Sequence, residues 1–138
     1  MKEFATEIKQ AYYNRLNDVI SVPVFDQVPR DHKGNYVLFQ GVTGFTGQAE
    51  TKCSRGYDIS VTLQVVTRFE GNQGGYHLAE SISGELIPLI GTRGNYITTT
   101  SFQVVTTTLG AVNELYVPFE TGAIYKRIIT FNHQIKEI

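Results

Sequence analysis

The pattern of apolar and polar residues predicts two amphipathic helices. Over residues 2–18, apolar side chains recur at the helical period, at Phe4, Ile8, Tyr12 and Leu16. Over residues 76–87, a second apolar stripe consists of Leu78, Ala79, Ile82 and Leu86. We expect Asn17 and Asp18 to close the first helix. The second is expected to end or kink at Ile87, because the proline that follows disfavours helical geometry there.

Alternation at period two predicts one long strand over residues 57–69. The odd positions are mostly apolar and the even positions mostly polar, as in a strand with one buried face. This length exceeds that of an ordinary strand. Such a strand either bends at a bulge or projects beyond its own core, where it offers pairing edges to a neighbouring subunit.

Other segments are predicted to be extended or irregular. Residues 21–29 hold two prolines and fit an edge strand or an extended crossing. Residues 36–42 are almost continuously apolar, which favours burial on both faces. β-branched residues make 95–108 a strand. Residues 123–135 form a last long strand, in which a bulge near Ile128 would switch the apolar face. Segments 43–55 and 109–122 are expected to be loops.

These elements follow the order α-β-β-β-α-β-β, in which turns rather than crossover helices join the long strands. This order predicts an α+β fold: a largely antiparallel twisted sheet with two helices packed on one side. A length of 138 residues and the lack of a linker predict one domain over 1–138.

Composition points towards contact with other proteins. Only 18% of the residues are charged, the formal net charge is −1, and Thr, Ser, Asn, Gln and Gly are abundant. A surface that carries few charged groups suits contact with another protein, because few ions must lose their hydration. A net charge close to zero argues against a protein dedicated to binding nucleic acid. The single Cys, an N-terminal segment unlike a signal peptide and the lack of a long apolar run predict a reducing cytosol and no membrane span.

No motif specifies an enzyme, a cofactor site or a metal site. His32 and His77 are expected on the surface and His133 at the core edge, since no ligand-type residue stands at metal spacing to them. Cys53 lies between cations that would lower a thiol pKa, but no base is placed beside it. The glycine-rich run 71–75 lacks the Lys-Ser/Thr ending of a phosphate-binding loop.

Basic residues are sparse and only partly grouped along the chain, and five of them are the candidate site residues. They are Lys52, Arg55, Arg68, Lys126 and Arg127. Their ordinary interpretation is surface charge. Their functional interpretation is the lining of a subunit interface or of a channel through which DNA passes, where cations attract phosphates without regard to sequence.

The order of elements resembles that of the tail-terminator and tail-completion proteins of long-tailed bacteriophages. The resemblance covers residues 2–135 and includes YNRLND, VPVFDQVP, NYVLFQGV, YDISVTLQVVTRF, GNQGG, YHLAESISGEL and YKRIITFNHQI. No single one of these motifs is specific. Residues 95–108 and the segment NELYVPFETGA depart from the family pattern, which leaves open a different partner preference or a different neck component.

The resemblance implies a virion protein, assembled in the host cytoplasm, that forms a ring, usually a hexamer, on top of the tail tube. Such a ring stops tube growth, contacts the head-side connector and lets DNA pass through its centre. The alternatives are another neck subunit, such as a head-completion or stopper protein, and a small-ligand-binding or enzymatic α+β domain with a pocket between sheet and helices.

Overall fold

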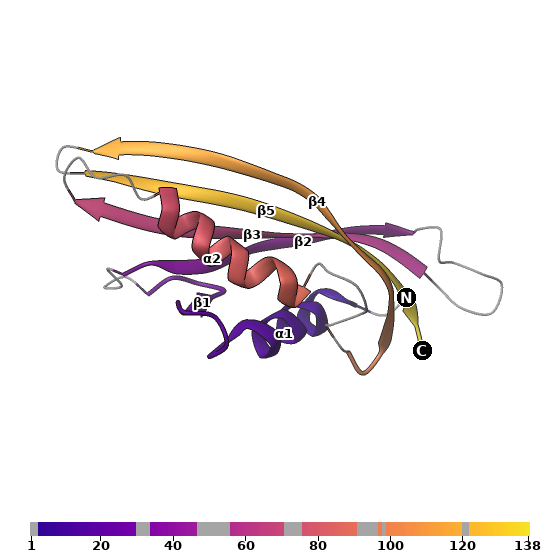
Figure 1. Ribbon diagram of the computed structural model, residues 1–138. Helices are drawn as coiled ribbons and strands as arrows, with labels where there is room; N and C mark the ends of the chain where they lie inside the picture. The colour runs from indigo at the N-terminus through magenta and orange to yellow at the C-terminus, as the bar shows by residue number, and fades with distance from the viewer. Residues whose placement is uncertain are drawn as a thin grey trace.

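A computed structural model describes residues 3–29, 34–46, 56–70, 76–90, 97, 99–119 and 122–138. Within these ranges, two helices pack on one face of a five-stranded sheet (Figure 1). The elements are α1 (Ala5–Leu16), β1 (Val24–Phe25), β2 (Tyr36–Thr46), β3 (Gly56–Glu70), α2 (Tyr76–Ile90), β4 (Phe102–Phe119) and β5 (Gly122–Glu137). The predicted α+β class and the predicted order of elements are both confirmed.

The strands of the sheet lie in the order β1-β2-β3-β5-β4. The short β1 runs parallel to β2, and every other pair is antiparallel. β3 and β5 form the centre, with uninterrupted pairing from Gly56 opposite Lys136 to Glu70 opposite Gly122. The predicted long strand is therefore paired on both sides, and β4, not β3, is the long strand at an edge of the sheet.

The helix α1 is held at both ends by groups of its own sequence. The Glu3 carboxylate accepts hydrogen bonds from the backbone N–H groups of Phe4 and Ala5. At the other end, Asn17 is extended and Asp18 has a positive φ of 62°, which closes the helix as predicted. The predicted stripe is buried against the sheet: Phe4, Ile8, Tyr12 and Leu16.

The helix α2 continues through Pro88 to Ile90, so of the two predicted alternatives, an end or a kink at Ile87, the end is wrong. A proline inside a helix costs about 3 kcal/mol, because a hydrogen bond is lost and the ring crowds the preceding turn. Here the apolar face continues past the proline, and Ile90 is fully buried. Burial of such a side chain contributes about 1.5–3 kcal/mol, which offsets most of the cost.

The strand β2 is longer than predicted and is buried on one face only. It runs from Tyr36 to Thr46, so residues 43–46 of the predicted loop are strand, and residues 47–55 lie outside the described part. Val37 and Phe39 are buried, whereas Leu38 and Gln40 are not. Gly44 allows α1 to come close, because a Cβ there would lie 2.5 Å from Phe4 Cζ.

The largest correction concerns β4. Residues 109–119, expected as a loop, are strand, and they pair with β5 up to Phe119 opposite Gly122. Of the predicted strand 95–108, residues 95, 96 and 98 lie outside the described part, and β4 begins at Phe102. Pro118 can occupy β4 because β4 is an edge strand. At alternate positions of an edge strand the backbone N–H points away from the sheet, and a proline there removes no hydrogen bond between strands.

The predicted bulge near Ile128 is absent, because β5 keeps a continuous register with β3. The irregularities lie in its neighbours instead: in β4 between Val104 and Thr106 and between Leu109 and Ala111, and in β2 between Phe39 and Gly41. Ile124 and Ile128 therefore remain on the face opposite to Ile129 and Phe131. The core fills the space between the helices and the covered sheet face.

Candidate functional site

The face of the sheet that carries no helix, called the helix-free face here, is the first candidate surface. Strand side chains alternate between faces, so the even-numbered residues of β3 and β5 belong to this face. Around the middle of the sheet it is made of neutral polar side chains, several of them joined across strands. Ser60 donates a hydrogen bond to Asn132 Oδ1 at 2.8 Å, and Gln64 donates one to Gln40 Oε1 at 2.7 Å.

Towards the β3 end at Glu70, the helix-free face changes character. Tyr36, Val66, Lys126 and Leu115 stand opposite one another across four strands, and Arg68, Ile124 and Val117 form the next row. This zone combines apolar side chains with two cations. The face as a whole is therefore divided into a neutral polar zone and an apolar, cationic zone.

The structure brings together only some of the candidate basic residues. Arg68 and Lys126 are diagonal neighbours on the helix-free face, since Arg68 pairs with Ile124 and Val66 with Lys126. Arg127 faces the opposite side, where its guanidinium donates a hydrogen bond to Glu114. Lys52 and Arg55 lie outside the described residues.

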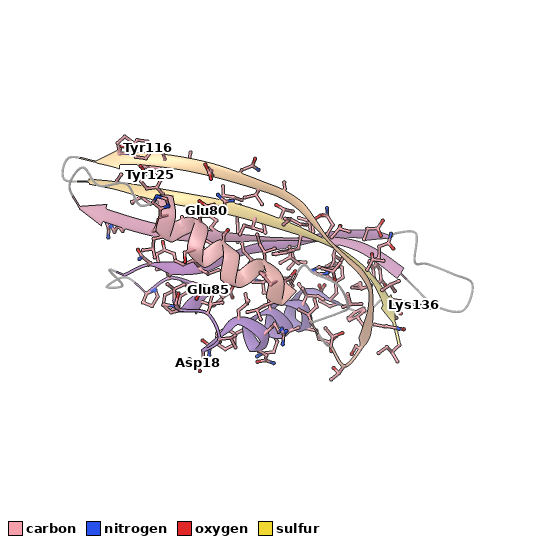
Figure 2. All side chains as sticks on the ribbon, in the orientation of Figure 1. Asp18, Glu80, Glu85, Tyr116, Tyr125 and Lys136 are labelled. Carbon is pink, nitrogen blue, oxygen red and sulfur yellow. The ribbon has the colours of Figure 1, made fainter. Side chains whose placement is uncertain are left out.

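A second candidate surface is the end of the β4–β5 pair, residues 111–119 and 122–128, which we call the tip hairpin. Figure 1 shows both strands continuing past the first turn of α2. On the helix side the rings of Tyr116 and Tyr125, labelled in Figure 2, are in contact, with centroids 5.0 Å apart and ring planes tilted by 44°. Leu115, Tyr116 and Val117 are all exposed.

The sequence pattern does not predict the tip hairpin, because it predicts a loop over the residues of its β4 half. The signal was present as three consecutive apolar residues within an otherwise polar segment, at 115–117. An apolar run lacks the period of a strand with one buried face. A run of exposed apolar residues fits a strand that no other part of the same chain covers on either face.

His133 is the only histidine buried in the part of the chain that the structure describes, and it is 1% exposed. Its Nε2 meets the hydroxyl of Tyr12, and its Nδ1 lies 2.9 Å from Thr107 Oγ1. A neutral imidazole donates at one nitrogen and accepts at the other, so both neighbours satisfy it. Burial lowers the pKa of His133 from 6.5 to about 4 and raises that of Tyr12 well above 10. This group joins α1 to the sheet within the core.

Two open surface hollows occur among the described residues. One, of about 400 Å³, lies on the helix-free face beside Asp58, Asn132 and Thr106. The other, of about 450 Å³, lies between α1 and β1. No group of three or more His, Cys, Asp or Glu residues in the described ranges is arranged to hold a metal ion. None of the described helices is long and apolar enough to cross a membrane.

Comparisons with known proteins give a likeness in structure and none in sequence. No protein-family model matches the chain, and no curated protein matches it. Among solved structures, the chain is similar to one chain of a structure entitled "Virion of native gene transfer agent (GTA) particle", with a TM-score of 0.73 and 13% identity. The match covers 95% of this chain and 96% of that chain, so the two share a fold over almost their entire lengths.

Proposed function

We propose that this protein is a structural virion subunit of a phage-like particle, and that it forms the ring that caps the tail tube. The observation that carries the proposal is the nearly full-length fold likeness to a chain of a gene transfer agent virion. It is joined by the order of elements, which resembles that of tail terminators. The ring is proposed to be a hexamer that ends tube growth, contacts the head-side connector and has no enzymatic role.

The free edge of β4 supports assembly into a ring. β4 is the last strand of the sheet, and no strand of the described part pairs with its outer side. An unpaired edge of this length is a template for contact with another chain. Subunits that associate head to tail close into a ring when their rotation allows it.

The helix-free face supports the passage of DNA. Its central zone offers hydroxyl and amide groups, and its charged residues with described side chains are Asp58, Arg68, Lys126 and Lys136. A few cations attract phosphates weakly and independently of sequence, whereas a dense cationic lining would hold the strand back. We therefore propose this face, with Arg68 and Lys126, as the channel lining, and Arg127 as a residue of the opposite side.

The test is assembly of the purified protein with tail-tube protein. Native mass spectrometry and electron microscopy are expected to show rings alone and tubes capped at one end in the mixture. Tubes of normal length without caps, together with rings that bind connector protein, would favour a stopper or other neck subunit. A protein that stays monomeric at every concentration, with and without tube protein, contradicts the proposal.

A further inference from the structure

The helix-free face carries one acid among its described side chains, Asp58. The other charged side chains described on that face are the cations Arg68, Lys126 and Lys136. The proposed function brings DNA phosphates along this face, and a bare carboxylate repels them. Asp58 by itself therefore opposes the passage that the proposed function requires.

Asp58 borders the hollow of about 400 Å³ on the helix-free face. Two rows of side chains from β3, β5 and β4 line this hollow: Asp58, Gln134 and Thr106 in one row, and Ser60, Asn132 and Thr108 in the next. Each of them offers oxygen, from a carboxylate, an amide or a hydroxyl group. His133 also borders the hollow, but its two ring nitrogens already have partners in Tyr12 and Thr107. The hollow is therefore a site of oxygen ligands.

The Asp58 carboxylate lacks a partner within the described part of the chain. Its Oδ1 is buried and accepts no hydrogen bond there. The hydroxyls of Ser60 and Thr108 donate to Asn132 instead, to Oδ1 at 2.8 Å and to the backbone oxygen at 3.5 Å. Lys136 is the diagonal neighbour of Asp58 on the same face, and no ion pair joins these two side chains. A buried carboxylate oxygen without a partner is costly, so this group is suited to a cation from solution.

The ligands around Asp58 fit a hydrated Mg²⁺ ion. The described ranges hold no group of three or more His, Cys, Asp or Glu residues that would hold a metal by themselves. Mg²⁺ does not need such a group, since it keeps several waters and is bound through one or two carboxylates together with phosphate oxygens. The open hollow leaves room for the waters, and DNA supplies the phosphates.

We infer that Asp58 holds a hydrated Mg²⁺ ion in this hollow, and that the ion binds a phosphate oxygen of the passing DNA. The inference rests on the proposed function, because DNA is the source of the phosphate. A bound divalent cation is the largest local charge, so it turns the repulsion at Asp58 into attraction. A single carboxylate holds the ion weakly, so the contact breaks as the DNA moves on.

Binding of Mn²⁺ to the purified protein, measured by electron paramagnetic resonance, tests the metal site. Mn²⁺ takes the same oxygen ligands as Mg²⁺, and we expect a roughly millimolar dissociation constant and displacement by excess Mg²⁺. Asp58→Asn keeps the shape of the side chain, removes its charge and is expected to weaken binding at least about tenfold. Asp26→Asn is the matched control, because it removes an exposed acid beside α1, and it should leave binding unchanged.

Lys136→Gln is a second variant that changes the site in the opposite direction. It leaves the carboxylate in place and removes the neighbouring cation, so it is expected to tighten Mn²⁺ binding about threefold. This variant tests the site even if Asp58→Asn fails to fold, and Mn²⁺ binding that Lys136→Gln leaves unchanged or weakens counts against a metal at Asp58.

Binding of a short DNA duplex to the assembled ring tests the bridge to phosphate. Without divalent ions, Asp58→Asn is expected to bind DNA about threefold more tightly than the wild type, because an acid has been removed. With Mg²⁺ at matched ionic strength, the wild type is expected to bind at least as tightly as the variant, because only the wild type carries the ion. A ratio of the two affinities that Mg²⁺ does not change contradicts the bridge.

Two further outcomes overturn the inference. Equal Mn²⁺ binding by the wild type and by Asp58→Asn, or no binding by either, removes the metal from Asp58. Binding by single subunits that is lost in the ring assigns Asp58 to an interface between copies instead. Rings and capped tubes in these cases leave the proposed function intact, whereas a wild-type protein that never assembles overturns the proposed function whatever Mn²⁺ does.

Discussion

The part of the sheet under the helices and the tip hairpin contrast in how their side chains are covered. Under the helices, the residues of β5 that face α1 and α2 are fully buried, as at Ile129, Phe131 and Ile135. In the tip hairpin the same strand pair continues with the same backbone pairing, but Leu115, Tyr116 and Val117 of β4 are exposed, on both faces of the strand. Backbone pairing alone is therefore enough to hold a strand in the sheet. The pattern of apolar and polar side chains shows which faces of the strand are covered by other parts of the subunit.

This difference separates the residues that stabilise the subunit from those that are available for contact with other proteins. Residues under the helices pack in the core of the subunit, so their substitution is expected to change the free energy of unfolding. Residues 115–117 of the tip hairpin are exposed, so their substitution is expected to change association more than folding.

Phe131→Asp is expected to have the largest effect. Phe131 is fully buried, packs near Tyr12 and lies in the central strand β5. The substitution removes the ring and buries an uncompensated charge, so we expect a loss of at least about 4 kcal/mol. Thermal unfolding followed by circular dichroism measures it. Phe131→Leu, which keeps the site apolar, is the control and should stay folded; a native melting temperature for the Asp variant would contradict the assigned core face.

Acid is expected to have the next largest effect, through His133. Its pKa is about 4 when folded and 6.5 when unfolded, so between these values the unfolded chain binds more protons. Stability from this group is complete above pH 6.5, falls as the pH is lowered towards 4 and then levels off. The total loss is about 3 kcal/mol. Urea unfolding at a series of pH values measures it.

The control for the acid effect is His133→Gln, which keeps polar atoms near Tyr12 and Thr107 but does not titrate. The variant is expected to be less stable at neutral pH and to lose the slope between pH 4 and 6.5 that His133 contributes. An unchanged slope would show that another group is responsible for the acid dependence.

Leu115→Lys with Tyr116→Lys is expected to have the smallest effect on the subunit. Both side chains are exposed, but the change removes the ring contact of Tyr116 with Tyr125 and sets a lysine opposite Lys126, so under conditions where the protein is monomeric we expect the free energy of unfolding to fall by about 1 kcal/mol. Chemical unfolding of dilute protein measures this value. A loss as large as that of Phe131→Asp would mean that the tip hairpin belongs to the core, and the separation of the two regions would fail.

Much of the fold follows from periodicity along the chain. The helical stripe from Phe4 to Leu16 and the alternation over residues 57–69 predicted α1 and β3 closely, because one side of each element is buried. Prediction failed where that condition does not hold. In the second half of β4, residues 115–117 are exposed on both faces and show no period, and α2 passes Pro88 because a buried Ile90 offsets the proline.

The candidate site was predicted only in part, for a related reason. Basic residues can be counted from the sequence, but the face on which each lies depends on register. Lys126 and Arg127 are adjacent in sequence and lie on opposite faces, whereas Arg68 and Lys126 are distant in sequence and are diagonal neighbours on one face. The expected bulge near Ile128 would have changed these faces, and only the pairing of β5 with β3 settles them.

The amino-acid sequence by itself determined the class of fold, the order of elements and the stripes that form the core, since these depend on local period and on the burial of apolar side chains. Only the tertiary structure decided which strand is the free edge, which cations share a face and where apolar residues remain uncovered. These properties depend on contacts between segments far apart in the chain, and no local pattern encodes the partner of a strand.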